Sequence, residues 1–175
     1  WQSGAGALDW YSGAQLAARG DIVVVAPNFR LGALGWMAIP GGTANLGQLD
    51  QEAALEWVRA HIDAFGGDPE CVTVMGQSAG AVSVACMMIR KVRMERGILQ
   101  SASLGRGFRS LAKAHEIAAI LLEAAGAQTL AQAQGLPLQA LLDAQRAAPV
   151  VQWLAAEGAQ RSLFGPVADG TVLPL

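Results

Sequence analysis

The sequence predicts an α/β fold with a mostly parallel sheet and helices on both faces. Two observations support this prediction. Short runs of β-branched apolar residues, which suit strands covered on both faces, alternate with stretches whose apolar residues recur every three or four positions. Glycines and prolines separate these stretches, and strands that alternate with helices form parallel sheets with right-handed crossovers.

The first half of the chain begins with this alternation. Residues 10–19 predict a short helix that Gly20 ends. Residues 21–26 (DIVVVA) are a β-branched run ended by Pro27, which indicates a strand, and an irregular glycine-rich stretch follows. The clearest helix covers residues 46–65, where apolar residues fall at three- and four-residue spacing before a Gly-Gly-Asp-Pro stop.

The remaining elements continue the pattern. Two further strands are expected at residues 71–75 and 97–100. The sequence predicts helices at residues 79–89, 110–125 and 138–146. We expect a loop at residues 127–135 and a turn-rich, extended tail at residues 164–170.

Length and composition exclude several classes of protein. A chain of 175 residues is long enough for one domain with a sizeable core, and 53% apolar against 15% charged residues excludes intrinsic disorder. The net charge of −2, without a block of one sign, gives no basic face for nucleic acid. Glycine, proline, serine or glutamine interrupts every nearly uncharged stretch before the ~20 residues that cross a bilayer, so no membrane partner is expected.

The two cysteines do not indicate a disulfide framework or a metal site. Cys71 and Cys86 are too few for a disulfide framework or a cysteine-based zinc site. We expect both to be reduced and buried as small apolar side chains. No metal ion and no organic cofactor is expected.

The motif with the clearest chemistry is Gly76-Gln77-Ser78-Ala79-Gly80, between a predicted strand and a predicted helix. This is the context of a G-x-S-x-G nucleophile elbow, a sharp turn whose strained serine projects its hydroxyl above the sheet. Gly76 and Gly80 are expected to give the turn room. The N–H of Ala79, at the start of the helix, is expected to stabilise an oxyanion formed beside Ser78. Taken alone, the pentapeptide could be a chance glycine-flanked turn.

A catalytic serine needs a base, and the chain offers only two histidines. In elbow hydrolases the order along the chain is serine, acid, histidine. His61 precedes Ser78 and lies at the exposed end of a predicted helix, whereas His115 lies within another helix. We expect both to be ordinary helix histidines. Either Ser78 is therefore not catalytic, or the base lies outside residues 1–175.

The order of several sequence blocks resembles the type B carboxylesterases, which include cholinesterases and bacterial para-nitrobenzyl esterases. The matching segments, with the family pattern in parentheses, are residues 10–13 and 16–25 (YDG…L…GDVVVV), 28–36 (NYRLGxxGF), 45–51 and 54–58 (NxGLxDQ…ALxWV), 62–69 (NIxxFGGDP), 98–101 and 164–170. Ordered blocks at family spacing are far more specific than the pentapeptide. The resemblance implies an α/β-hydrolase fold.

The resemblance also implies what surrounds this chain. Residues 1–175 are expected to be the central part of a single α/β-hydrolase domain. The oxyanion-loop segment is expected before the position of Trp1, and the acid and histidine of the triad after the position of Leu175. Residues 1–175 alone are accordingly expected to be inactive. The family position of Trp1 leaves two roles open, lining the acyl pocket or plain packing.

The substrate implied by the resemblance is a small-molecule ester. Gln77 stands where the family usually has glutamate, so a preference for cationic substrates is expected to be weaker. The cysteine positions favour a bacterial cytoplasmic enzyme, with secretion left open. The oligomeric state is not predicted.

Two functions from different classes follow. The first is a serine-dependent carboxylic-ester hydrolase acting through an acyl-enzyme on Ser78. The second is a non-catalytic esterase-like binding or adhesion protein, against which the intact Gly-x-Ser-x-Gly motif argues. A phosphate-binding loop is excluded, because residues 76–80 lack the Lys-Ser/Thr ending and the G-x-G-x-x-G spacing.

Overall fold

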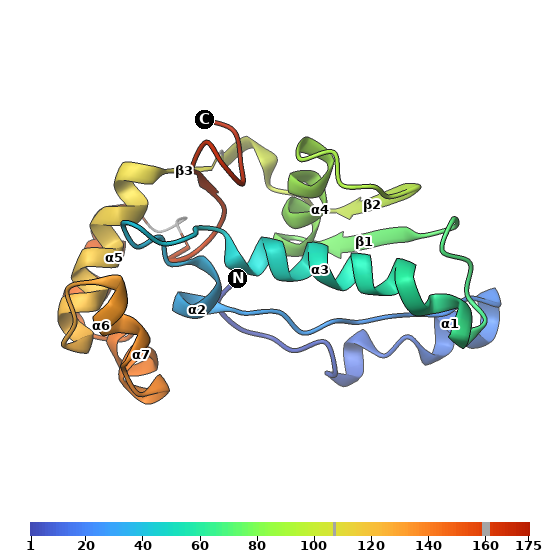
Figure 1. Cartoon of the computed structure of the whole chain (residues 1–175), viewed down its shortest axis with the longest axis horizontal. Helices are drawn as coiled ribbons and strands as arrows, with labels where there is room; N and C mark the ends of the chain where they lie inside the picture. Colours follow the sequence, from blue (N-terminus) through green and yellow to red (C-terminus); the bar gives the residue numbers. More distant parts are fainter. Residues whose placement is uncertain (107, 159–161) are drawn as a thin grey trace. The chain divides into compact units, whose positions relative to one another are not determined.

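The computed structural model describes residues 1–106, 108–158 and 162–175 (Figure 1). These residues form two compact units whose segments alternate along the chain. Unit 1 consists of Trp1–Gln2, Arg30–Gly47 and Gly107–Leu175, and unit 2 consists of Ser3–Phe29 and Gln48–Arg106. The single domain expected from the sequence stays a prediction.

Unit 2 is built around a parallel strand pair and the helix that connects the two strands. The elements of unit 2 are η1 (Asp9–Tyr11), α1 (Ala14–Gly20), most of α3 (Leu46–His61), η2 (Ile62–Phe65), β1 (Thr73–Gln77), α4 (Ala79–Ile89), β2 (Arg96–Gln100) and η3 (Leu104–Arg106). β1 pairs in parallel with β2, from Thr73 opposite Arg96 to Gln77 opposite Gln100. β1 begins at the end where α3 finishes and runs back alongside it (Figure 1).

Burial explains why α4 forms where the sequence predicted it. Seven consecutive residues of α4, from Ala81 to Met87, are buried. They are small or apolar, and the side chain of Val84 reaches the sheet, where its Cγ1 lies 3.4 Å from an ideal Cβ at Gly97. A helix that is apolar on all sides fits a site enclosed by other elements.

The predicted strands of unit 2 are confirmed in part. The predicted strand 97–100 extends back to Arg96, and the strand predicted at 71–75 instead covers Thr73–Gln77. The strand predicted at 21–26 is wrong, because no strand is assigned there. Residues Ile22–Val25 are 37–52% exposed, and within the described residues no neighbouring strand pairs with them. A β-branched run becomes a strand only where a partner completes its backbone hydrogen bonds.

Unit 1 is mainly helical. The elements of unit 1 are α2 (Gly32–Trp36), the first two residues of α3, β3 (Arg109–Ser110), α5 (Leu111–Ala125), α6 (Leu130–Gln134), α7 (Leu138–Ala144), α8 (Ala148–Ala156) and β4 (Val167–Ala168). Its core joins Leu121 of α5 with Leu141, Val150 and Trp153 of the following helices, together with Trp36. β3 and β4 form a short parallel pair.

Two of the predicted elements of unit 1 are confirmed and one is wrong. The helices predicted at residues 110–125 and 138–146 are α5 and α7. The loop predicted at residues 127–135 contains α6, because Thr129 and Gln132 form a capping box that satisfies the free N–H groups of the first turn. α2 and α8 were not predicted.

The buried side chain of Asn45 and the half-buried side chain of Asp169 fix the end of the chain in unit 1. The amide of Asn45 donates to the carbonyl of Val167 at 2.9 Å and accepts its N–H at 2.8 Å. Asp169 Oδ1 accepts three backbone N–H groups of residues 171–173 at 2.8–3.2 Å. Burial of the Asp169 carboxylate raises its pKa, but these donors outweigh burial and hold the pKa below its ordinary value.

Trp153 of α8 is tied to α5 through its indole. Its Nε1–H donates to Glu116 Oε1 at 2.6 Å, and the side-chain cations of Arg109 and Lys113 lie 5.5 and 5.8 Å from its ring. The bond from Trp153, followed by that from Lys113, lowers the pKa of Glu116. The indole thus links two helices by both packing and charge.

Candidate active site

Ser78 occupies the sharp turn between β1 and α4. It precedes the first residue of α4 and has φ +54° and ψ −112°. An L-residue with these angles is strained. Two backbone hydrogen bonds hold the turn, from the N–H of Ser78 to Gln100 O at 2.8 Å and from the N–H of Val82 to Ser78 O at 3.1 Å.

The two glycines of the motif have different surroundings. A Cβ at Gly76 would lie 2.3 Å from the carbonyl carbon and oxygen of Gly80 and 2.7 Å from the nitrogen of Ala81. These are backbone atoms, so no side-chain movement could relieve the contact. A Cβ at Gly80 would meet no described atom within 4 Å, outside its own helix backbone. The steric reason for glycine therefore applies to Gly76, whereas the described residues leave space around Gly80.

The surroundings of Ser78 favour a negative charge. Ser78 and its neighbour Gln77 are exposed, and the Ser78 side chain makes no capping bond to α4. The start of this 11-residue helix, including the N–H of Ala79, carries the positive end of the helix dipole. An oxyanion formed beside Ser78 would be stabilised there.

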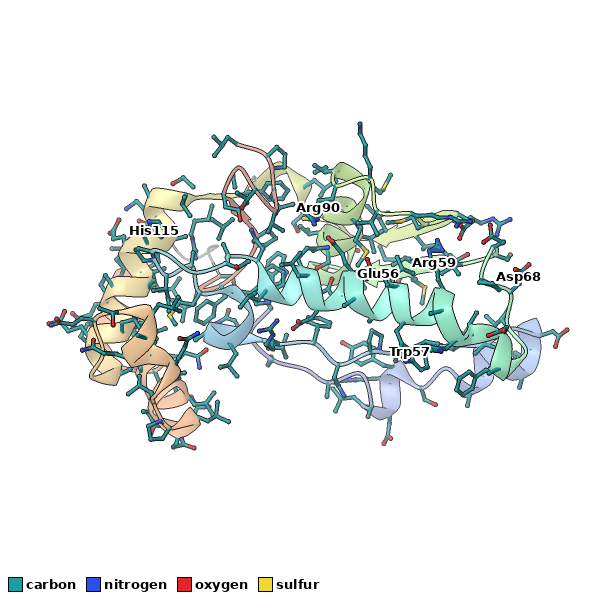
Figure 2. All side chains as sticks on the ribbon, in the orientation of Figure 1. Glu56, Trp57, Arg59, Asp68, Arg90 and His115 are labelled. Atoms are coloured by element: carbon teal, nitrogen blue, oxygen red, sulfur yellow. The ribbon has the colours of Figure 1, made fainter. Side chains whose placement is uncertain are left out.

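Within unit 2, His61 is not placed as a base for Ser78. His61 is the last residue of α3, and its ring lies against that of Trp57, tilted by 47° with centroids 5.1 Å apart. α3 and β1 run in opposite directions, so the end of α3 and the end of β1 lie at opposite ends of unit 2 (Figure 1). His115 lies in α5 of unit 1 and is half-buried (Figure 2).

Trp1 packs inside unit 1. Its ring meets the ring of Trp36 edge-on at 6.1 Å, and an ideal Cβ at Gly165 would lie 3.3 Å from it. Its carbonyl accepts the N–H of Gly32 at 2.8 Å. Of the two roles left open by the sequence, the packing role is observed, and the acyl-pocket role stays a prediction.

Gln100 also belongs to the site, although the sequence alone did not indicate it. Its backbone carbonyl anchors Ser78 because the parallel register places Gln100 opposite Gln77. Every residue has a backbone carbonyl, so the residue type at position 100 does not predict this hydrogen bond. The available signal was the strand prediction at residues 97–100, which placed a second parallel strand beside the elbow strand.

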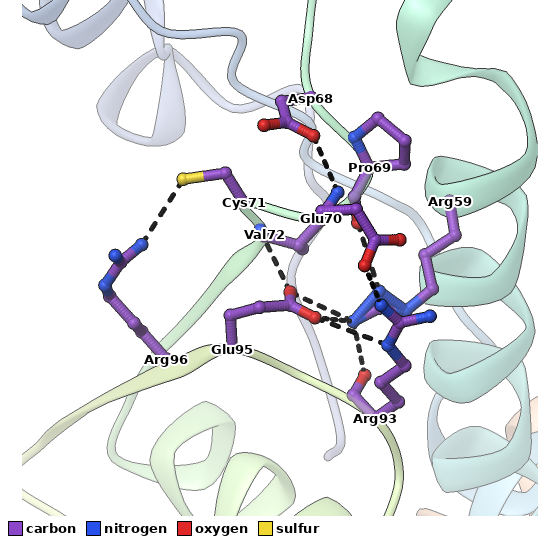
Figure 3. A network of polar contacts seen from close by, with 9 residues as sticks. All are labelled: Arg59, Asp68, Pro69, Glu70, Cys71, Val72, Arg93, Glu95 and Arg96. Atoms are coloured by element: carbon purple, nitrogen blue, oxygen red, sulfur yellow. Dashed lines mark hydrogen bonds and ion pairs between the residues drawn. The ribbon is translucent and has the colours of Figure 1, made fainter.

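A polar network ties the opposite end of the strand pair to α3 (Figure 3). Arg59 of α3 donates from Nη2 to both carboxylate oxygens of Glu95 at 3.1 Å and to the carbonyl of Arg93 at 2.8 Å. Glu95 Oε2 also accepts the N–H of Val72 at 3.0 Å. Arg59 and Trp57 lie on opposite sides of α3, with Arg59 toward the strands (Figure 2).

The two cysteines differ in environment, and both are free thiols. Cys86 in α4 is buried as expected, and its burial, followed by the charge of Glu52, raises the pKa of Cys86 to about 12. The expected burial of Cys71 is wrong. Cys71 is exposed, and its Sγ accepts a hydrogen bond from Arg96 at 3.3 Å (Figure 3).

The described residues hold neither a candidate metal cluster nor a candidate membrane span. Within residues 1–106, 108–158 and 162–175, no three His, Cys, Asp or Glu side chains gather where they could hold a metal ion. Among the helices of the same residues, none has both the length and the apolar character required to cross a bilayer.

A parallel strand pair joined through a strained serine turn to a buried helix is the local architecture of the α/β hydrolases. The sequence model of the Carboxylesterase family matches residues 1–175, and the chain belongs to this family. The fold and the family expected from the sequence are both confirmed.

Individual proteins are similar to this chain over most of its length. The para-nitrobenzyl esterase of Bacillus subtilis is 36% identical over 178 residues, which cover 98% of this chain and 36% of that protein. A probable N-octanoylanthranilate hydrolase of Rhodococcus erythropolis is 50% identical over 128 residues, covering 71% of this chain and 28% of the relative.

Solved structures agree with these relatives. A PNB esterase superposes with a TM-score of 0.87 at 35% identity, over 99% of this chain and 38% of that structure. A Geobacillus stearothermophilus carboxylesterase gives 0.84 at 34% identity, over 99% and 38%. The chain thus spans about a third of the length of the relatives it matches.

Proposed function

We propose that this chain carries the nucleophile of a serine-dependent carboxylic-ester hydrolase. The observation that carries the proposal is the exposed, strained Ser78 at the start of α4 (φ +54°) in a chain of the Carboxylesterase family. The relatives reported above are described as esterases or hydrolases. This supports catalysis over the non-catalytic binding role.

In the proposed reaction, Ser78 Oγ attacks the carbonyl carbon of an ester and gives its proton to a base. The tetrahedral oxyanion is held by the N–H of Ala79, a contact worth about 3 kcal/mol of barrier by comparison with other oxyanion donors. Collapse of this intermediate expels the alcohol, which takes the proton, and leaves an acyl-enzyme. Water then releases the carboxylic acid and restores Ser78.

We place the base and its orienting acid outside residues 1–175. The position of His61 at the far end of α3 from the end of β1 supports this. So does the length of the relatives, of which the chain spans about a third. On this proposal residues 1–175 form the central part of one α/β-hydrolase domain and have no turnover alone.

We propose small-molecule esters as substrates, with a weakened preference for cationic ones. The support is Gln77, an exposed and uncharged side chain next to the nucleophile. A neutral amide adds no Coulomb attraction for a cation, whereas a carboxylate at that position would. We also propose a cytoplasmic location, supported by the two free thiols and tested by cell fractionation.

Hydrolysis of p-nitrophenyl acetate tests the proposed function. We expect turnover by the native polypeptide that carries residues 1–175, and its loss in Ser78→Ala. Ser83→Ala in the same helix serves as the matched control and should retain turnover. Turnover that survives Ser78→Ala, or no turnover by the native polypeptide with any p-nitrophenyl ester, would contradict the proposal.

A further inference from the structure

The helix that follows Ser78 is held at its far end by a largely buried ion pair. Arg90, directly after the last residue of α4, donates to Glu52 of α3 from Nε at 2.6 Å and from Nη2 at 3.0 Å. The Glu52 side chain is 11% exposed and that of Arg90 23%. Two parallel bonds between planar groups fix orientation as well as distance.

A second, weaker link lies nearer to Ser78. Gln48 is fully buried one helical turn before Glu52, so both side chains lie on the same face of α3. Its Nε2 donates to Glu52 Oε1 at 3.3 Å and to the carbonyl of Ser83, in α4, at 3.4 Å. The side chains of α3 thus contact α4 both in its first half and at its end.

The ion pair between Glu52 and Arg90 fixes the position of α4 more than it stabilises the fold. Desolvation of a buried ion pair roughly cancels its attraction, and apolar pairs of similar volume often replace such pairs without loss of stability. An apolar pair, however, allows sliding and rotation that a two-bond ion pair does not. The pair is therefore best placed to fix the register of α4 against α3.

The register of α4 affects Ser78 because the helix is rigid and Ser78 is its N-cap. About 18 Å of helix separates Ser78 from Arg90, at 1.5 Å per residue. A slide or rotation of α4 along this length is passed to the turn that carries the hydroxyl. Misplacement of a reacting group by 1 Å can cost about 100-fold in rate.

We propose that Glu52 and Arg90 are positioning residues that set the location of Ser78 through α4. The proposal rests on the proposed ester hydrolase function. Loss of the pair lowers the rate of attack by Ser78 while substrate binding is retained. It therefore lowers kcat and leaves KM nearly unchanged.

The test compares three variants of the native polypeptide, with kcat expressed per titrated active site so that unfolded molecules do not count. Arg90→Lys keeps the charge but loses the two-bond geometry. Glu52→Gln removes the charge, and the double variant E52M/R90M restores packing without the directional bonds. Glu70→Gln, which breaks an exposed ion pair with Arg93, is the matched control.

We expect kcat to fall about tenfold in Arg90→Lys, in Glu52→Gln and in E52M/R90M, with KM within twofold. The thermal midpoint of the double variant should stay close to that of the wild type. Glu70→Gln should match the wild type. Unchanged kcat per titrated site in Arg90→Lys would overturn the proposal. So would a loss of total activity that is explained entirely by a smaller number of titrated sites. If the wild type itself lacks turnover, the proposed function fails first, and the two failures are thus distinguishable.

Discussion

The two glycines around Ser78 should respond in opposite ways to the same added methyl group. In Gly76→Ala, the new Cβ would lie 2.3 Å from the Gly80 carbonyl, whereas real Cβ atoms do not approach other atoms within 3.0 Å. The turn must open by at least about 0.7 Å. Overpacking of this kind costs about 1–3 kcal/mol of stability.

Gly80→Ala should behave differently, because its Cβ meets no described atom within 4 Å and Gly80 lies in the first turn of α4. Alanine is favoured over glycine in a helix by about 0.5–1 kcal/mol. The two variants should therefore differ by about 1.5–4 kcal/mol, from the sum of these two effects.

Urea unfolding of both variants measures this difference, and the labelling rate by a fluorophosphonate reports the position of Ser78. Labelling should slow about 100-fold in Gly76→Ala and stay within a few-fold of the wild type in Gly80→Ala. Equal loss of stability in the two variants would refute the steric reasoning, and so would a Gly76→Ala protein that labels at the wild-type rate.

Three further predictions concern unit 1. Asn45→Ala leaves the buried N–H and carbonyl of Val167 unpaired and should cost about 2–4 kcal/mol in urea unfolding; a loss below 0.5 kcal/mol would contradict the assignment. Because the folded pKa of Asp169 lies below its unfolded value of about 3.9, its stabilisation is present above that pH and lost as the pH falls through the folded pKa. The stability difference between the wild type and Asp169→Asn should accordingly shrink in acid, and a gap independent of pH would be inconsistent with this. In Trp153→Phe the pKa of Glu116, followed by NMR titration, should rise toward its ordinary value, and no change would mean that the indole bond does not lower it.

Sequence patterns predicted correctly the elements that depend on residues adjacent in the sequence. The helix at residues 79–89 and the turn at Ser78 follow from small residues and glycine spacing, and both are present. The strand at residues 21–26 failed because a strand depends on a partner elsewhere in the chain, which periodicity does not reveal. α6 was not predicted because its capping box, at Thr129 and Gln132, lies in a stretch whose glutamine- and alanine-rich composition favours a loop.

The sequence predicted those parts of the candidate site that depend on the residue types of the pentapeptide itself. Ser78 and the need for glycine at Gly76 follow from the pentapeptide, whereas the openness around Gly80 depends on the exact course of the helix. The anchoring by Gln100 and the pair between Glu52 and Arg90 join residues far apart in sequence. Single residue types gave no sign of either contact.

The most direct measurement is the site of covalent modification by a fluorophosphonate. The native polypeptide is treated with the reagent, digested, and analysed by mass spectrometry. Our account predicts one adduct, on the peptide that contains Ser78, and its disappearance in Ser78→Ala. An adduct on another serine, or ester turnover without any modification of Ser78, would contradict the assignment of this hydroxyl as the nucleophile.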